Sequence, residues 1–263
     1  MAEVFGTPEQ REMQRRAHAL WTLLKTNRRI MCHGRLLSVS FETPDCVDLV
    51  MSLAQLQGSA GFESVPDDAV KLVQKPLHDA GFQTEAAVEW LAGSSAIRFA
   101  EKIINSFSLP DGVTLQKVDT NTPSVTLEAM SDMATHCGEW LAMGDFVRGH
   151  ARPSAFHYLA DAQAKPIAMA GCVVHAGRLH HREEEGWWGM VAVDDKWKRK
   201  GLTHYVGAQV LRSMRVDHGI EKFSTVVRES QAGFASLIAD LGFNPTRNSS
   251  IYVQNPSAFA MVG

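Results

Sequence analysis

Apolar residues in the first 110 positions recur mainly at the three- and four-residue spacing of amphipathic helices. Residues 9–25 show this pattern, and the preceding Thr7 and Pro8 suit the N-cap and the first turn of a helix. The same spacing predicts further helices over 45–57, 66–82 and 84–107. The last of these is expected to break near Gly93, and the alternation in residues 35–43 predicts a strand. The N-terminal region is therefore predicted to be mainly helical, with two or three strands.

The pattern changes after the segment SLPDGV, residues 108–113, where Pro, Asp and Gly cluster as they do in linkers. From there the predicted order is strand, helix, three strands, loop, helix, strand, helix, strand. We therefore predict a mainly helical domain over 1–110 and an α+β domain over 111–263. HDAGF at 78–82 faintly echoes ADLGF at 239–243, so a degenerate second copy of one fold is among the options for the N-terminal domain.

Composition limits the class of protein. The 263 residues are 45% hydrophobic and 21% charged, which is typical of globular domains with a sizeable core. The net charge of −3 argues against a dedicated nucleic-acid-binding domain, because such domains are usually strongly basic. No apolar run reaches the roughly 18 residues of a membrane span, and the polar N-terminus lacks the apolar core of a secretory signal. The four cysteines are scattered outside any zinc-ligand spacing, so we expect reduced thiols, no metal and a cytoplasmic location.

The stretch VAVDDKWKRKGLT, residues 191–203, combines the features of an anion site. An apolar strand leads into a basic loop, a glycine and a helix, and a helix N-terminus presents unpaired N–H groups and a positive dipole end. Gly201 has no Cβ, so a ligand can approach the backbone closely there. Lys198, Arg199 and Lys200 add charge of the sign that a phosphate requires. The stretch therefore predicts a pyrophosphate site.

This segment resembles the acetyl-CoA signature of the GCN5-related N-acetyltransferases, in which an apolar strand precedes Arg/Gln-x-x-Gly-x-Gly/Ala and a helix. The resemblance extends from about Val113 to Gln254 and includes the next strand, FSTVV, and a helix that ends at Gly242. The sequence departs from the signature at Lys198, in place of Arg or Gln, and at Thr203, in place of Gly or Ala. The resemblance implies a mixed central sheet flanked by helices, and acetyl-CoA as cosubstrate.

The resemblance also assigns residues to the cosubstrate. It implies that the backbone of Val191 and Val193 pairs with the pantetheine arm, and that the N–H groups of residues 199–203 hold the pyrophosphate. Gln231 stands near a position where the family often has an Asn that contacts CoA. The residues expected to bind acetyl-CoA are therefore Val191, Ala192, Val193, Lys198, Arg199, Lys200, Gly201, Leu202, Thr203 and Gln231.

The resemblance leaves the catalytic groups open. The family often has an acidic Tyr about four residues before the Gly-Phe that ends the last helix, but Ile238 stands there in this chain. Tyr252, in the last predicted strand, is an alternative acid. For the base the family often uses a Glu at the start of the strand before the phosphate loop, where this chain has Glu185. His175 is a second candidate base, and a packing role stays open for each of the three candidates, Glu185, His175 and Tyr252.

The leading prediction is an enzyme, an acyltransferase that moves an acetyl group from acetyl-CoA to a primary amine by direct attack. We expect the acceptor to be a small molecule or a peptide, and neither nucleic acid nor membrane to be a partner. The alternative is a non-catalytic acyl-CoA-binding or regulatory protein with a degenerate active site. DNA binding through residues 196–200 is a third reading, which the overall charge disfavours. The domain over 1–110 would cover the acceptor site, form a homodimer interface or be a degenerate copy of the second domain.

Overall fold

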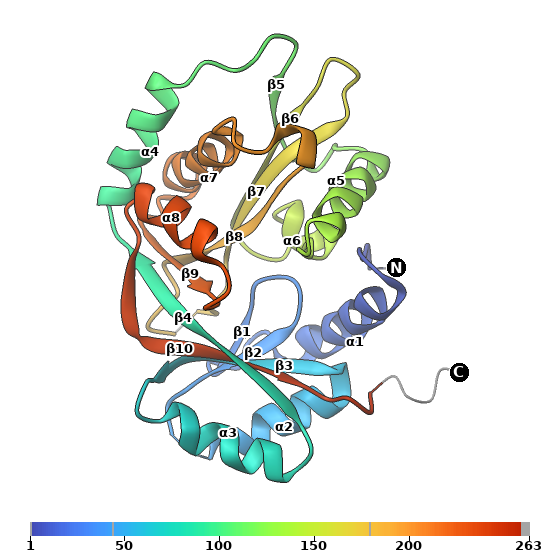
Figure 1. Ribbon diagram of the computed structural model, residues 1–263. Helices are drawn as coiled ribbons and strands as arrows, with labels where there is room; N and C mark the ends of the chain where they lie inside the picture. The colour runs from blue at the N-terminus through green and yellow to red at the C-terminus, as the bar shows by residue number, and fades with distance from the viewer. Residues whose placement is uncertain (1, 44, 179, 259–263) are drawn as a thin grey trace.

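The computed structural model describes residues 2–43, 45–178 and 180–258, so the end of the second predicted domain, 259–263, lies outside the described residues. Within them, ten strands form one mixed sheet in the order β1-β2-β3-β10-β4-β9-β8-β7-β6-β5 (Figure 1). The strands are β1 (Ile30–Cys32), β2 (Leu37–Ser40), β3 (Ser59–Pro66), β4 (Gln83–Ala92), β5 (Thr114–Lys117), β6 (Ser154–Ala160), β7 (Pro166–Val174), β8 (Glu185–Val193), β9 (Lys222–Val227) and β10 (Asn244–Gln254). The predicted fold class, α+β with a mixed sheet flanked by helices, is confirmed.

Helices cover the sheet and form two hydrophobic cores with it. The helices are α1 (Pro8–Leu24), α2 (Cys46–Gln57), α3 (Val70–Asp79), α4 (Ser95–Ser106), α5 (Ser124–His136), α6 (Gly144–Val147), α7 (Leu202–His218) and α8 (Ala232–Asp240), with a 3₁₀ turn η1 (Asp195–Trp197). One core joins α1, α2, α3, α5 and α6 to the sheet, and the other joins α4, α7 and α8 to it. As predicted, Thr7 caps α1, where it forms a capping box with Gln10. None of the helices in the described part of the chain is long and apolar enough to cross a membrane.

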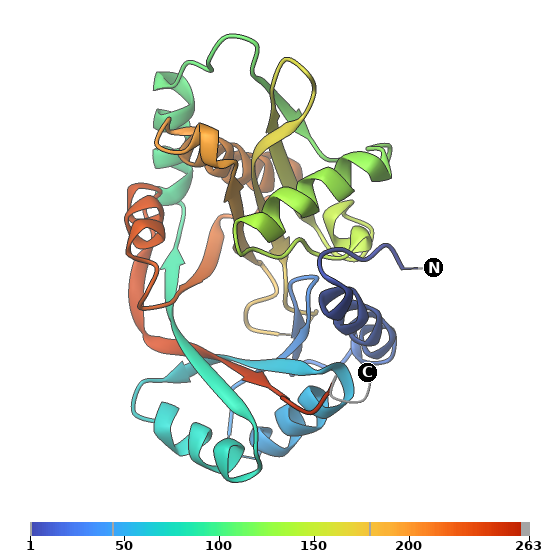
Figure 2. The same ribbon diagram turned by 45° about the vertical axis from the view of Figure 1, so that its right-hand side comes forward.

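Two sets of elements with the same order form two lobes. In the N-terminal lobe α2 connects the parallel strands β2 and β3, and in the C-terminal lobe α7 connects the parallel strands β8 and β9. A further helix then leads to the last strand of each set, β4 or β10. Each last strand lies beside the other lobe's parallel pair, because β10 pairs with β3 and β4 pairs with β9. β4 and β10 also pair with each other, and Figures 1 and 2 show them crossing between the lobes.

The helices before these two last strands end in the same way. Gly81 and Gly242 both have a φ of 86°, in the left-handed region that favours glycine. In each case the following phenylalanine donates its N–H over 3.0 Å to a carbonyl five residues back, from Phe82 to Leu77 and from Phe243 to Ile238. The two Gly-Phe pairs of the sequence therefore terminate corresponding helices at corresponding places in the two lobes.

The helix predicted over 84–107 is wrong in its first half. Residues 83–92 form the strand β4, and a helix, α4, begins only after Gly93. The run AAVEWLA has good helix formers, but β4 is hydrogen-bonded on both edges, to β9 and to β10. Pairing on two sides outweighs the weak local preference for a helix. The predicted linker 108–113 lies in the irregular segment between α4 and β5. Strands that precede it and strands that follow it are nevertheless interleaved in the sheet, in the order β3-β10-β4-β9.

Candidate functional site

The sheet opens between β8 and β9. These parallel strands pair from Glu185 to Trp187 on β8 and from Lys222 to Ser224 on β9. Beyond that point β8 continues for six residues along β7, while β9 continues along β4, so the two strands diverge. In the other lobe the corresponding ladder runs to the end of β2, and Phe41 extends it by donating its N–H to Glu63 O over 3.0 Å. The opening is therefore a feature of the C-terminal lobe.

The edge of β8 at this opening presents backbone groups. Asp194 donates its N–H to Ile167 on the β7 side over 2.9 Å, so by antiparallel alternation Val193 and Val191 direct their N–H and C=O groups toward the opening. A β-bulge at Met190, with a φ of 54°, lies at the start of this edge. The side chain of Ala192 is buried on the opposite face from those of its two neighbours.

The basic loop wraps around the N-terminus of α7. Arg199 and Gly201 have left-handed backbones, with φ of 60° and 73°, and bend the chain so that α7 starts at Leu202. A groove of about 220 Å³ next to this helix start is lined by Val193, Trp197, Arg199, Gly201, Leu202, Thr203 and His204. Lys198 pairs with Asp195 at 2.7 Å, and Lys200 lies 4.4 Å from the ring centre of Trp197. The loop thus combines free helix N–H groups with cationic side chains at one groove.

A ring from the N-terminal half occupies the space beside Gly201. A Cβ added to Gly201 would lie 2.8 Å from a ring carbon of Phe107, and that ring stacks on Tyr205 of α7 with centroids 5.0 Å apart. The sequence predicted that the missing Cβ makes room for a ligand, whereas in the structure it makes room for Phe107. Phe107 therefore connects the segment after α4 to the start of the loop.

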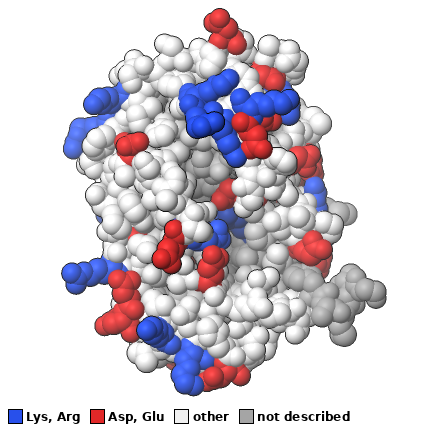
Figure 3. Space-filling view, viewed as in Figure 1, with Lys and Arg blue, Asp and Glu red and all other residues white. Residues whose placement is uncertain are grey.

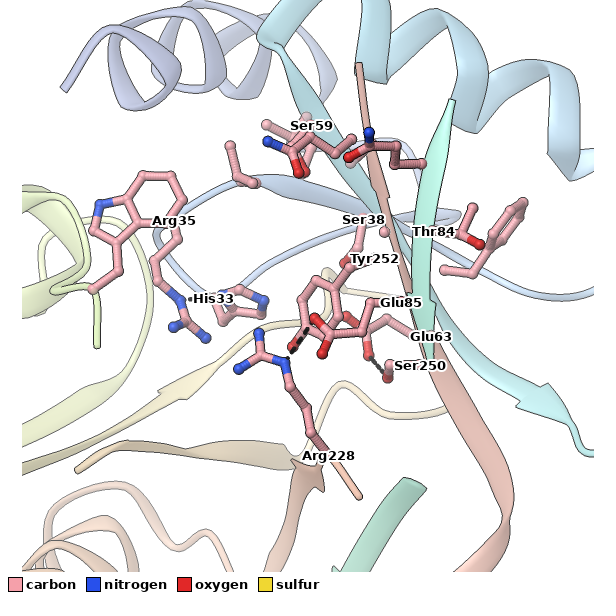
Figure 4. A pocket seen from close by; sticks show the side chains of 18 of the residues that line it. His33, Arg35, Ser38, Ser59, Glu63, Thr84, Glu85, Arg228, Ser250 and Tyr252 are labelled. Atoms are coloured by element: carbon pink, nitrogen blue, oxygen red, sulfur yellow. Dashed lines mark hydrogen bonds and ion pairs between the residues drawn. The ribbon is translucent and has the colours of Figure 1, made fainter. Parts of the chain in front are cut away.

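A cavity of about 390 Å³ lies between the lobes on the side of the sheet that α5 covers (Figure 4). Its floor is the sheet face of β3, β10 and β4, and its walls include His33, residues 35–38, residues 138–140 after α5, and Arg228 after β9. Cys137, at the end of α5, donates its Sγ–H to Val193 O over 3.2 Å. The cavity therefore adjoins the open ends of β8 and β9, and Figure 3 shows a hollow near the centre of this face with basic side chains above it.

Polar groups converge in this cavity from both lobes. Arg228 binds Glu85 of β4 at 2.9 Å and lies 5.4 Å from the ring centre of Tyr252. Arg35 lies over the ring of Trp187 at 4.8 Å, and His33 stacks on the same ring at 4.6 Å. Burial, with a contribution from Arg35, lowers the pKa of His33 well below its usual range, so this ring is neutral at pH 7.

Tyr252 stands on the cavity floor in β10, directly between Gly61 of β3 and Glu85 of β4. Burial raises the pKa of its phenol to about 12. The hydroxyl is therefore a proton donor throughout the neutral range. Of the three candidate catalytic residues, Tyr252 is the one that lines the cavity.

Glu185 and His175 lie in a buried network outside the cavity lining. The Glu185 carboxylate pairs with Arg182 and lies 3.6 Å from His175, while Arg182 also pairs with Glu89 of the other lobe at 2.7 Å. Burial opposes ionisation of Glu185, but His175 and Arg182 outweigh it and lower its pKa to about 2. A carboxylate with so low a proton affinity is a poor base at pH 7, and this geometry gives Glu185 a role in joining the lobes.

Gln231, at the N-terminus of α8, lines neither the groove at Gly201 nor the inter-lobe cavity. Its side-chain oxygen accepts a hydrogen bond from the N–H of Arg228 over 3.2 Å, and its own N–H donates to Arg228 O over 2.9 Å. Gln231 therefore fixes the turn that carries Arg228 into the cavity. Among the described residues, no group of three or more His, Cys, Asp or Glu side chains is arranged to hold a metal ion.

Comparison with solved structures identifies the architecture. A GCN5-related N-acetyltransferase from Kribbella flavida is 16% identical, with a TM-score of 0.57 over 93% of this chain and 95% of that one. The chain has the fold of the GCN5-related N-acetyltransferases. A tandem protein of this fold from the clavulanic acid pathway is 13% identical, with a TM-score of 0.54 over 81% of this chain and 67% of that one. An N-acetyltransferase-like protein from Streptococcus suis is 12% identical, with a TM-score of 0.52 over 83% of this chain and 80% of that one. No protein-family model and no curated protein sequence matches the chain.

On this acetyltransferase fold, several cavity residues carry no sequence motif. Arg35, Glu63, Glu85 and Arg228 come from four separate segments and meet only through the folded sheet. Arg35 and Glu63 belong to the N-terminal half, for which sequence reasoning gave no site. The Glu in AGFESV, a charged residue among mostly apolar ones, is a signal that could have indicated Glu63.

Proposed function

We propose that this protein transfers an acetyl group from acetyl-CoA to a primary amine. The observation that carries the proposal is the opening between β8 and β9, whose strand edge runs from the helix-start groove at Gly201 toward the wall of the inter-lobe cavity that follows α5. An extended thiol-bearing arm and its phosphates fit the strand edge and the groove, and a separate acceptor fits the cavity. Acyl transfer requires the acyl donor and the acceptor to meet at one point, and a pocket for a single ligand does not bring two substrates together.

In this proposal the phosphates bind at the loop, with the pantetheine arm along β8. Backbone groups of Val191 and Val193 pair with the arm, and Ala192 holds the strand in register by packing. The N–H groups of residues 199–203 bind the pyrophosphate, and Lys198 and Lys200 add charge at its edge. Gln231 acts indirectly, by fixing the turn before α8.

The acceptor amine attacks the thioester carbonyl directly. The new C–N bond forms as the C–S bond breaks, the proton of the amine passes to solvent water, and the CoA thiolate takes up a proton from an acid of the protein. A strand N–H near the bulge at Met190 polarises the carbonyl. Tyr252 is our proposed acid for the thiolate, because its raised pKa keeps it protonated. Glu185 and His175 are assigned to the lobe interface.

We propose that residues 1–110 are a degenerate second acetyltransferase-like lobe that forms the acceptor half of the site, with the acetyl-CoA half in 111–263. The matching order of elements and the matching helix ends at Gly81 and Gly242 support the first part. The closed ladder between β2 and β3 gives that lobe no opening for a second acyl-CoA. Its sheet face instead forms the floor of the cavity.

A non-catalytic acyl-CoA-binding protein is the alternative. The observation that favours it is the position of the two expected bases, because Glu185 is held in a buried ion pair with Arg182, His175 is buried beside it, and neither residue lines the cavity. A sensor of acyl-CoA would need the strand edge and loop but no proton acceptor.

Calorimetric titration with acetyl-CoA, followed by thiol release measured over a panel of primary amines, tests the proposal. The expected result is binding of acetyl-CoA together with CoA release that depends on an amine. Binding without amine-dependent release would favour the acyl-CoA sensor. Failure of acetyl-CoA and longer acyl-CoA esters to bind would overturn both functions.

A further inference from the structure

We infer that Glu63 binds the ammonium group of the acceptor, and that the acceptor is a small monocationic amine without a carboxylate. The inference rests on the function proposed above, since it assigns the inter-lobe cavity to the acceptor. The cavity volume of about 390 Å³ lies at the small end of ligand pockets, which span about 300–1,000 Å³. Three features of the described residues carry the assignment: the setting of Glu63, the charge balance of the cavity and its unpaired neutral donors.

Glu63 is a buried carboxylate that the fold directs into the cavity. Glu63 is 6% exposed, and its carboxylate accepts a hydrogen bond from Ser250 Oγ over 2.8 Å. A β-bulge sets this orientation, because Glu63 and Ser64 together face Ser250 of β10. Ser64 has a φ of 60°, which is strained for a residue other than glycine. Figure 4 shows the side chains of Glu63, Glu85 and Tyr252 gathered opposite Arg228.

The charges of the cavity lining do not balance. The lining holds two arginines and three glutamates, which leaves one negative charge when His33 is neutral. Glu85 pairs with Arg228 at 2.9 Å and Glu139 with Arg35 at 3.5 Å, whereas Glu63 has no ion pair within the described part of the chain. Arg182 is a buried cation that interacts electrostatically with Glu63, but its ion pairs are with Glu89 and Glu185.

A buried carboxylate without a counter-ion is costly, so a cationic ligand would stabilise this site. One ammonium group brings the lining to neutrality. A zwitterionic amino acid would leave the negative charge in place, and both arginines that could receive its carboxylate are already engaged. The balance therefore points to one positive charge and no negative charge on the acceptor.

Two further lining groups are neutral hydrogen-bond donors without partners. Ser38 Oγ and Trp140 Nε1 are both buried, and neither has a hydrogen-bond partner among the described residues. Buried donors of this kind normally bind an oxygen or nitrogen atom of protein, water or ligand. A hydroxyl or carbonyl group on the acceptor would satisfy them.

The test measures binding of matched amines and amino acids by calorimetry, with saturating CoA and without it. Tyramine is compared with tyrosine, and isoamylamine with leucine, since each pair differs by one carboxylate. We expect each amine to bind at least about tenfold more tightly than its amino acid, and Glu63→Gln to lose at least about tenfold in amine affinity. Glu42→Gln is the control, because Glu42 is ion-paired with Arg29 on the same lobe and lies outside the cavity lining.

Equal binding of amines and amino acids by the wild-type protein would overturn the inference, even if Glu63→Gln failed to fold. Unchanged amine affinity in a folded Glu63→Gln would overturn it too, as would the absence of amine binding. Amine binding without acetyl transfer would support the role of Glu63 and overturn the proposed enzyme. Acetyl transfer at the same rate in Glu63→Gln as in the wild type would support the proposed enzyme and overturn the role of Glu63. Failure of the inference can therefore be distinguished from failure of the proposed function.

Discussion

Tyr252 is the residue on which proton delivery depends in the proposed reaction. Replacement by Phe removes the hydroxyl but keeps the ring beside Arg228. We expect Tyr252→Phe to lower kcat about 100-fold with little change in KM for acetyl-CoA. Because the pKa of Tyr252 is raised to about 12, its hydroxyl should cause no loss of kcat in the wild type up to about pH 10. Steady-state kinetics over pH would check both, with Tyr158→Phe as the control, and an unchanged kcat would remove Tyr252 from the mechanism.

Glu185 has a different role, since it joins the lobes through Arg182. Its pKa in the folded protein is lowered to about 2, so the unfolded chain binds the proton more readily between about pH 5 and pH 2. The stability that Glu185 contributes is therefore complete above about pH 5 and is lost as pH falls toward 2. At pH 7 we expect Glu185→Gln to lower the free energy of unfolding by about 3 kcal/mol.

Urea unfolding at several pH values would measure this effect. Glu185→Gln should lose less stability than the wild type as the pH falls from about 5 to about 3. Glu184→Gln, a change at the exposed neighbouring residue, should follow the wild type. If all three proteins showed the same pH dependence, the ion pairs of Glu185 would contribute nothing to folding.

At the scale of elements, the loop between η1 and α7 depends on its backbone more than on its cations. Gly201 needs a positive φ and has a ring carbon of Phe107 next to its missing Cβ. We expect Gly201→Val to weaken acetyl-CoA binding about tenfold or more, because a β-branched residue is strained there. Lys196→Ala should change affinity less than about threefold, since it removes one exposed charge. Calorimetry on folded variants would measure this, and an equal or reversed order would contradict the phosphate-loop role.

Local signals allowed the C-terminal elements to be predicted and failed where pairing decided the structure. The strand, the loop, the glycine and the helix start all lie within residues 191–203, so the structure of this segment could be predicted from local sequence. Strand β4 was not, because its neighbours β9 and β10 lie more than a hundred residues away in the chain. Glu63 was missed for a similar reason, since a bulge against Ser250 sets its direction. Glu185 lies where the family resemblance predicted a Glu, but His175 and Arg182 determine its proton affinity.

At the scale of the whole molecule, the two halves share their strands. Residues 111–258 alone would lack β3 and β4, so β9 would lose one hydrogen-bonded partner and β10 would lose both of its partners. We expect this fragment to show no cooperative thermal unfolding and little near-ultraviolet circular dichroism, because its sheet is interrupted. Coexpression with residues 1–110 should restore both signals. A fragment that unfolds cooperatively on its own would show that the lobes are independent.

The position of β10 also determines when the protein can finish folding during synthesis. Ser59 Oγ donates to Val253 O across 194 residues of chain, and β10 fills the space between β3 and β4. Until β10 has left the ribosome, the N-terminal lobe has two unpaired strand edges and an incomplete core. Such edges are prone to pair with other chains, and contacts this distant in sequence form slowly. The nascent chain is thus exposed to aggregation for as long as the residues between β3 and β10 are being made.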